Sequence, residues 1–172
     1  MMSESAIDEY LPETGTGKAV MYLRTTAPTS GHTTQRDCLE RLSRLEASGQ
    51  LDSATVQVWG NSICTSAPAL AGLDDILERV TELYAFSAEH GATMSPFFRV
   101  ERIEATIAGE KFERIVPPHR TLVFENDDGV LGVFPCRVEG RTYTPFDAIG
   151  RLETTAELET VDAHEITATP HR

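Results

Sequence analysis

The sequence predicts an α+β fold, in which a β-α-β-α start is followed by antiparallel hairpins. Two observations lead to this class. Strand-like and helix-like segments alternate up to about residue 90, and the segments beyond it are strand-like and separated by turn residues. We therefore expect a mixed sheet with helices on one face and a short C-terminal helix.

The first strand is expected over residues 19–25, which read AVMYLRT and are rich in β-prone side chains. A second strand is expected over 54–59, with Ala54, Val56 and Val58 on one face. The helix between them, over about 34–48, makes this a right-handed β-α-β unit with parallel strands.

Apolar residues at helical spacing define both long helices. In the first helix they are Cys38, Leu42 and Leu45, and Gly49 follows as a stop signal. In the second they are Leu73, Ile76, Leu77, Val80, Leu83 and Tyr84. This second set is a complete amphipathic face, and Gly91 ends the helix.

The second half of the chain is expected to form hairpins. The strands are predicted over residues 97–107, 112–116, 121–125, 130–138 and 142–144. Asn126-Asp127-Asp128-Gly129 is a strong hairpin turn because these residues tolerate positive φ. Pro145 stands at a favourable first helical position for a helix over 146–152.

Charge distinguishes the ends of the chain from its middle. The net charge is −12, of which residues 1–17 and 153–172 contribute −4 each. We expect both ends to be disordered acidic tails around one domain over 18–152. Thirteen arginines against two lysines, together with the acidity, favour a halophilic, archaeal cytoplasm, with an ordinary acidic protein as the alternative.

Other localisation signals are not expected. The start lacks the basic and apolar regions of a signal peptide, and no apolar run is long enough for a membrane span. Three widely spaced cysteines do not make a disulfide framework.

The first candidate site is the loop between the first strand and the first helix, Arg24 to Thr34. Free N–H groups at a helix start can bind phosphate, and the nearby side chains could add donors. The candidate anion-binding residues are Arg24, Thr26, Ser30, His32 and Thr33. A capped helix start is the alternative. Tyr22, Arg24 and Thr26 also resemble the opening of serine recombinases, but the later arginine-rich motif of that family is absent, so no recombinase activity is implied.

The second candidate site is a metal centre at Cys64, Cys136 and His119, which requires the strands of the two cysteines to be neighbours. Because no short-spaced ligand pair is present, we expect neither a metal nor another cofactor. Buried packing is the alternative, and Cys38 is expected in the core.

Residues 19–152 resemble a group of small acidic haloarchaeal proteins of unassigned function. The resemblance rests on the VWGNSICT segment, the Pro-Phe-Phe strand start and the GVFPC…RTYT…DAIGRL ending. Such proteins are sometimes labelled helix-turn-helix, although the two long helices expected here are separated by a strand. The resemblance implies a habitat and a fold more than an activity.

The sequence thus favours a non-enzymatic regulatory or protein-interaction domain, dimeric through an exposed sheet edge or through the hairpin half. Two alternatives stay open. One is a nucleic-acid-associated transcriptional regulator, which the net negative charge disfavours. The other is a phosphate-ligand-binding enzyme that uses the loop from Arg24 to Thr34.

Overall fold

The computed structural model describes residues 7–24, 29–60, 62–64, 73–95, 97–105 and 110–167. The elements are η2 (a 3₁₀ helix, Asp8–Tyr10), β1 (Lys18–Leu23), α1 (Thr29–Ala47), β2 (Ser53–Val58), β3 (Ile63–Cys64), α2 (Leu73–Glu89), β4 (Ala92–Thr93), β5 (Arg99–Ala105), β6 (Glu110–Val116), β7 (Arg120–Asn126), β8 (Gly129–Phe134), β9 (Cys136–Val138), β10 (Arg141–Tyr143) and α3 (Pro145–Thr167). The predicted α+β class is confirmed.

A four-stranded sheet in the order β2-β1-β7-β8 forms the centre of the fold. β1 and β2 are parallel, as the β-α-β unit requires, and the other two pairs are antiparallel, so the sheet is mixed. β1 is buried from Ala19 to Leu23, which explains why its sequence is apolar without alternation.

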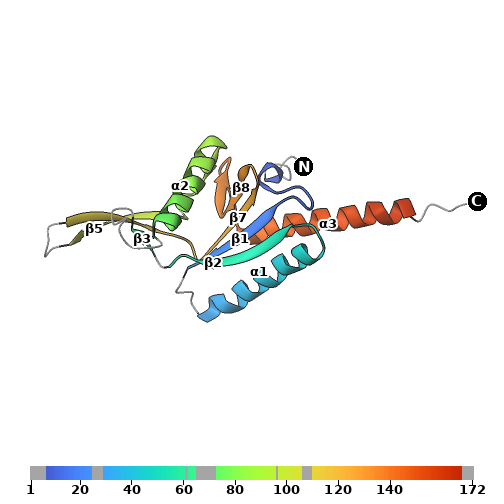
Figure 1. The fold of residues 1–172 in the computed structure, drawn as a ribbon, viewed down its shortest axis with the longest axis horizontal. Helices are drawn as coiled ribbons and strands as arrows, with labels where there is room; N and C mark the ends of the chain where they lie inside the picture. Colours follow the sequence, from blue (N-terminus) through green and yellow to red (C-terminus); the bar gives the residue numbers. More distant parts are fainter. Residues whose placement is uncertain are drawn as a thin grey trace, which may run out of the picture.

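A strand that is buried on both sides must be covered by other elements on both faces of the sheet. The observed layers therefore differ from the expected arrangement, in which the helices cover one face. α2 reaches one face, where Arg79 donates hydrogen bonds to Tyr22 and Glu125. On the opposite face Phe146 of α3 lies 5.9 Å from the guanidinium of Arg120. α1 lies beside α3, so the helices cover both faces and not one (Figure 1).

Two smaller sheets complete the hairpin half. One has the order β3-β6-β5 and the other the order β10-β9-β4. The strand expected over 130–138 is divided into β8 and β9 at Pro135, which has no N–H to donate to a ladder.

The two ends differ from the expected tails. Ile7 and Tyr10 are buried in the core, and the Tyr10 hydroxyl donates a hydrogen bond to the His90 carbonyl. At the other end, α3 continues through Thr167 and extends away from the rest of the fold (Figure 1). Residues 7–17 are therefore part of the folded unit, and residues 153–167 are helical.

Candidate interaction surface

β2 is an edge strand of the central sheet, and it is unusually open. Its sequence, SATVQV, contains no charged residue and no proline. Val56 is 48% exposed and Val58 61% exposed, and both are large apolar side chains. An exposed, uncharged edge strand is a template for pairing with another strand.

The hydrogen bonds around β2 show which of its backbone groups point outward. The Trp59 N–H donates to Leu23 in β1 (3.2 Å), whereas the Ala54 N–H donates to the Glu46 carboxylate in α1 (2.7 Å). Alternation along the strand then directs the amide groups of Ala54, Val56 and Val58 away from β1. Among the described residues, the outward amides of Val56 and Val58 have no recorded hydrogen-bond partner. We call these three residues the β2 edge.

The other long edge strands in the described ranges are protected. β8 has no exposed residue along its length, and η2 packs on one of its faces, where a Cβ at Gly132 would lie 2.1 Å from the Tyr10 carbonyl oxygen. β5 carries charged residues along its length, at Arg99, Glu101, Arg102 and Glu104. Charge and cover are the usual means of preventing unwanted pairing. β2 has neither, apart from the bond from Ala54 to Glu46.

One side of α1 adjoins the β2 edge. At 100° per residue, Leu39 and Glu46 lie on one side of the helix and Arg41 on the other. Glu46 contacts β2 and Arg41 contacts Glu153 of α3, so Leu39 lies on the side of the β2 edge. A hollow of about 630 Å³ on this side, the α1 flank, is lined by Gln35, Arg36, Leu39, Glu40, Ser43 and Arg44.

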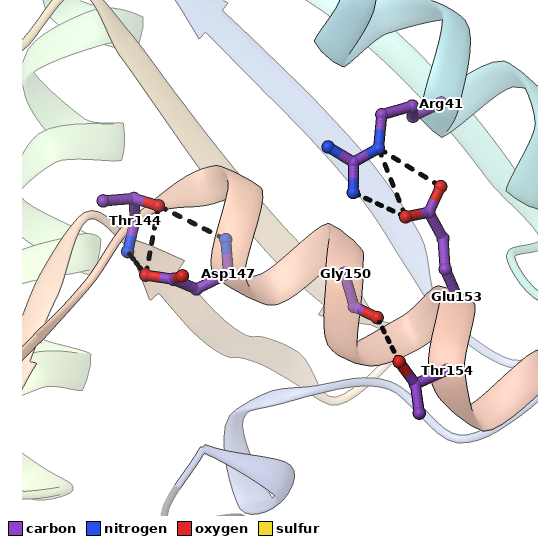
Figure 2. A network of polar contacts seen from close by, with 6 residues as sticks. All are labelled: Arg41, Thr144, Asp147, Gly150, Glu153 and Thr154. Carbon is purple, nitrogen blue, oxygen red and sulfur yellow. Dashed lines mark hydrogen bonds and ion pairs between the residues drawn. The ribbon is translucent and has the colours of Figure 1, made fainter.

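The opposite side of α1 is fixed by its contact with α3. The Arg41 guanidinium forms an ion pair of 2.5 Å with Glu153 (Figure 2). Thr144 caps the start of α3, because its Oγ1 accepts from the Asp147 N–H while its own N–H donates to the Asp147 carboxylate. α3 therefore occupies one side of α1 and leaves the α1 flank open.

The predicted anion-binding loop is only partly within the described residues. Thr26 lies outside them, and α1 begins at Thr29 instead of near Thr34, so Ser30, His32 and Thr33 belong to its first turns. The side chains of these three residues are also outside the description. The Arg24 N–H donates to the His119 carbonyl (3.1 Å), and its buried Nε has no partner among the described residues. Anion binding here stays a prediction.

The strands that carry Cys64 and Cys136 are not neighbours, so the condition set for a shared metal site is not met. Cys64 is in β3, which pairs with β6, whereas Cys136 is in β9, which pairs with β4 and β10. His119 is exposed, and the described residues contain no cluster of three or more potential metal ligands. Burial raises the pKa of the Cys136 thiol to about 12, so this thiol is not a nucleophile near neutral pH. Cys38 is in the core, as expected.

A smaller cavity beside α2 was not predicted from the sequence. It has about 190 Å³ and is lined by Tyr22, Trp59 and Arg79 among others. The ring of Trp59 stacks on Tyr22 at 4.5 Å, and Arg79 bonds to Tyr22 (2.8 Å) and Glu125 (2.7 Å). Burial raises the pKa of the Tyr22 hydroxyl. These polar groups bind one another, which suits a structural role better than a reaction.

The arginines of β5 and β6 are also paired with glutamates. Arg114 bonds to Glu101 at 2.7 Å, and Arg102 lies 3.2 Å from Glu113. The strand pair β5–β6 is therefore a surface of alternating charge and not a basic ribbon. No helix in the described ranges has both the length and the apolar composition needed to cross a membrane.

Comparison with known proteins places the chain in a family. The profile of a family described as a helix-turn-helix domain matches residues 12–157. No curated protein and no solved structure matches the chain. Within the described ranges no two helices are joined by a short turn: residues 48–72 and the strands β2 and β3 separate α1 from α2, and seven strands separate α2 from α3. The family description thus does not rest on a visible helix-turn-helix motif here, but the match covers most of the sequence, and the chain belongs to the helix-turn-helix domain family.

Proposed function

We propose that this chain is a non-enzymatic regulatory domain that acts by binding a protein strand along the β2 edge. The observation that carries the proposal is the exposure of β2, an uncharged strand in a protein of net charge −12. Strand addition supplies affinity through main-chain hydrogen bonds and specificity through alternate side chains. Val56 and Val58 are the side chains that would make those contacts.

Membership of a helix-turn-helix domain family supports a regulatory role. The described polar groups support a non-enzymatic one. Arg79 is occupied by Tyr22, Glu82 and Glu125, and the thiols of Cys38 and Cys136 are buried. These groups stabilise the fold and are not arranged around a reacting atom.

A photo-crosslinking amino acid at position 58 tests the proposal in cells. We expect it to form a covalent adduct with a protein that mass spectrometry identifies at the β2 edge. The matched control is position 100, because Val100 is 58% exposed and lies on the charged strand β5. Absence of an adduct at position 58, or adducts of equal yield at both positions, contradicts the proposal.

A nucleic-acid-binding regulator is the second candidate, and the family description favours it. The α1 flank offers Arg36 and Arg44, for which no ion pair is recorded among the described residues. The test is a mobility shift at low and high salt, because phosphate contacts weaken as salt rises. Binding at low salt that is lost in Arg36→Gln and retained in Arg102→Gln would support this candidate.

A further inference from the structure

We infer that the strand bound at the β2 edge is β2 of a second copy of this chain, antiparallel to the first about a two-fold axis through Val56. This inference rests on the proposed function and names the partner. Most soluble oligomers are homo-oligomers with closed symmetry, and two-fold dimers are the commonest. A two-fold axis perpendicular to paired edge strands makes the pairing antiparallel.

The side chains of β2 are self-complementary about Val56. In this register Val56 meets its own copy, and Ala54 meets the partner's Val58, so one face of the pairing is entirely apolar. On the other face Thr55 meets the partner's Gln57, a polar pair. Both valines, now 48% and 61% exposed, would be covered. Apolar and β-branched cross-strand pairs stabilise a sheet.

The outward backbone groups fit the same register. Val56 can exchange both of its hydrogen bonds with its copy, and the Val58 N–H can donate to the partner's Ala54 carbonyl. The Ala54 N–H is held by Glu46, so Glu46 limits how far the pairing extends. Four main-chain hydrogen bonds therefore form without displacing a bond that the single chain already has.

The rest of the sheet makes this association a closed dimer. Pairing of β2 with β8 of another copy is disfavoured, because β8 is buried or half-buried along its length whereas β2 is exposed from Thr55 to Val58. Among the described strands of the central sheet, the two β2 edges are left to pair with each other, which gives two copies and not a fibre.

Charge and area also favour a second copy. α1 carries three arginines and three carboxylates and is neutral, in a protein whose net charge is −12. Its 19 residues span about 28 Å. With a helix layer and a sheet layer together about 20 Å deep, the contact covers roughly 500–600 Å² per copy. The area buried on both copies together, roughly 1,000–1,200 Å², is near the lower limit for a stable interface, so dimerisation should depend on concentration.

Disulfide formation between introduced cysteines tests the axis directly. The experiment uses a Cys64→Ser chain, in which the two native thiols that remain, Cys38 and Cys136, are buried. Val56→Cys should give an oxidised dimer, since directly paired residues have Cα atoms about 5.5 Å apart, within disulfide range. Val58→Cys alone should not, because its copies would lie about 13 Å apart along the strands. Mixing Ala54→Cys with Val58→Cys should restore a crosslink between the two chains.

Light scattering of the unmodified chain is the second measurement. A mass of two chains at high concentration, with crosslinking at position 56, supports the inference. A single-chain mass at every concentration overturns it, and so does a dimer that crosslinks through Val58→Cys alone. If the protein is monomeric but position 58 still forms an adduct with another protein in cells, the second copy is excluded while the proposed function stands.

Discussion

Gly132 in β8 is the residue at which the N-terminal segment meets the central sheet. Its backbone lies against Tyr10, whose ring packs on Phe86 of α2 at 6.1 Å and whose hydroxyl bonds to His90. A side chain at position 132 would displace Tyr10 from the face of β8. The missing Cβ therefore allows η2 to pack on the face of β8.

We expect Gly132→Ala to lower the free energy of unfolding by about 1–3 kcal/mol, the usual cost of overpacking. Gly150→Ala is the matched control, because the nearest atom to a Cβ there is 3.8 Å away in an α3 position. That control should raise stability by about 0.5–1 kcal/mol through helix propensity. Urea denaturation of both variants measures these changes in stability. An unchanged midpoint in Gly132→Ala would show that Tyr10 does not pack tightly against Gly132.

At the scale of elements, α3 begins at a capping box, which is a pattern visible in the local sequence. Thr144 and Asp147 exchange hydrogen bonds around Pro145 (Figure 2). The helix start was predicted from Pro145 at the first helical position, and the capping box is a second local signal of the same start that the prediction did not use. The helix end was placed at Leu152, because the Thr- and Glu-rich segment after it has no apolar period.

Thr144→Ala should cost about 1 kcal/mol of stability, since it removes the N-cap of α3. Thr154→Ala is the control: its Oγ1 bonds to the Gly150 carbonyl within the same helix and is exposed. The control should change stability by less than about 0.5 kcal/mol. Thermal unfolding of the two variants measures the difference, and equal effects would argue against the cap.

Elements that depend on local pattern were predicted, and those that depend on strand order were not. The two faces of β2 follow from alternation, and the sequence also led us to expect an exposed sheet edge. Which strand lies at that edge depends on β1 pairing with β7, about a hundred residues away. The sheets that separate Cys64 from Cys136 are equally non-local. α2 on the second face had a local signal, the unbroken apolar run of β1, which predicts burial on both sides.

At the scale of the whole molecule, three buried titratable groups make the stability of the fold depend on pH in the alkaline range. Burial raises the pKa of Cys38 to about 11 and the pKa values of Cys136 and Tyr10 to about 12, from 9.0 for a thiol and 10.0 for a phenol. The neutral forms are favoured in the folded state. Their contribution is complete below pH 9 and is lost as the pH rises through the folded-state pKa values.

We therefore expect the free energy of unfolding to fall between pH 9 and 12 by an amount on the order of several kcal/mol. Cys136→Ala should fall less steeply over the same interval, because it lacks one of the three groups. Denaturant titrations at a series of pH values compare the two slopes. A stability that is constant up to pH 11, or equal slopes in the two proteins, would be inconsistent with this linkage.

The whole account depends on the open edge of the central sheet, and the mass of the protein in solution tests it most directly. Sedimentation equilibrium of the unmodified chain, Val58→Lys and Val100→Lys compares two equally exposed valines on different strands. We expect the unmodified chain and Val100→Lys to reach twice the single-chain mass with rising concentration, and Val58→Lys to stay at the single-chain mass. If the mass of the unmodified chain never exceeds that of a single chain, or if Val58→Lys still dimerises, the account is contradicted.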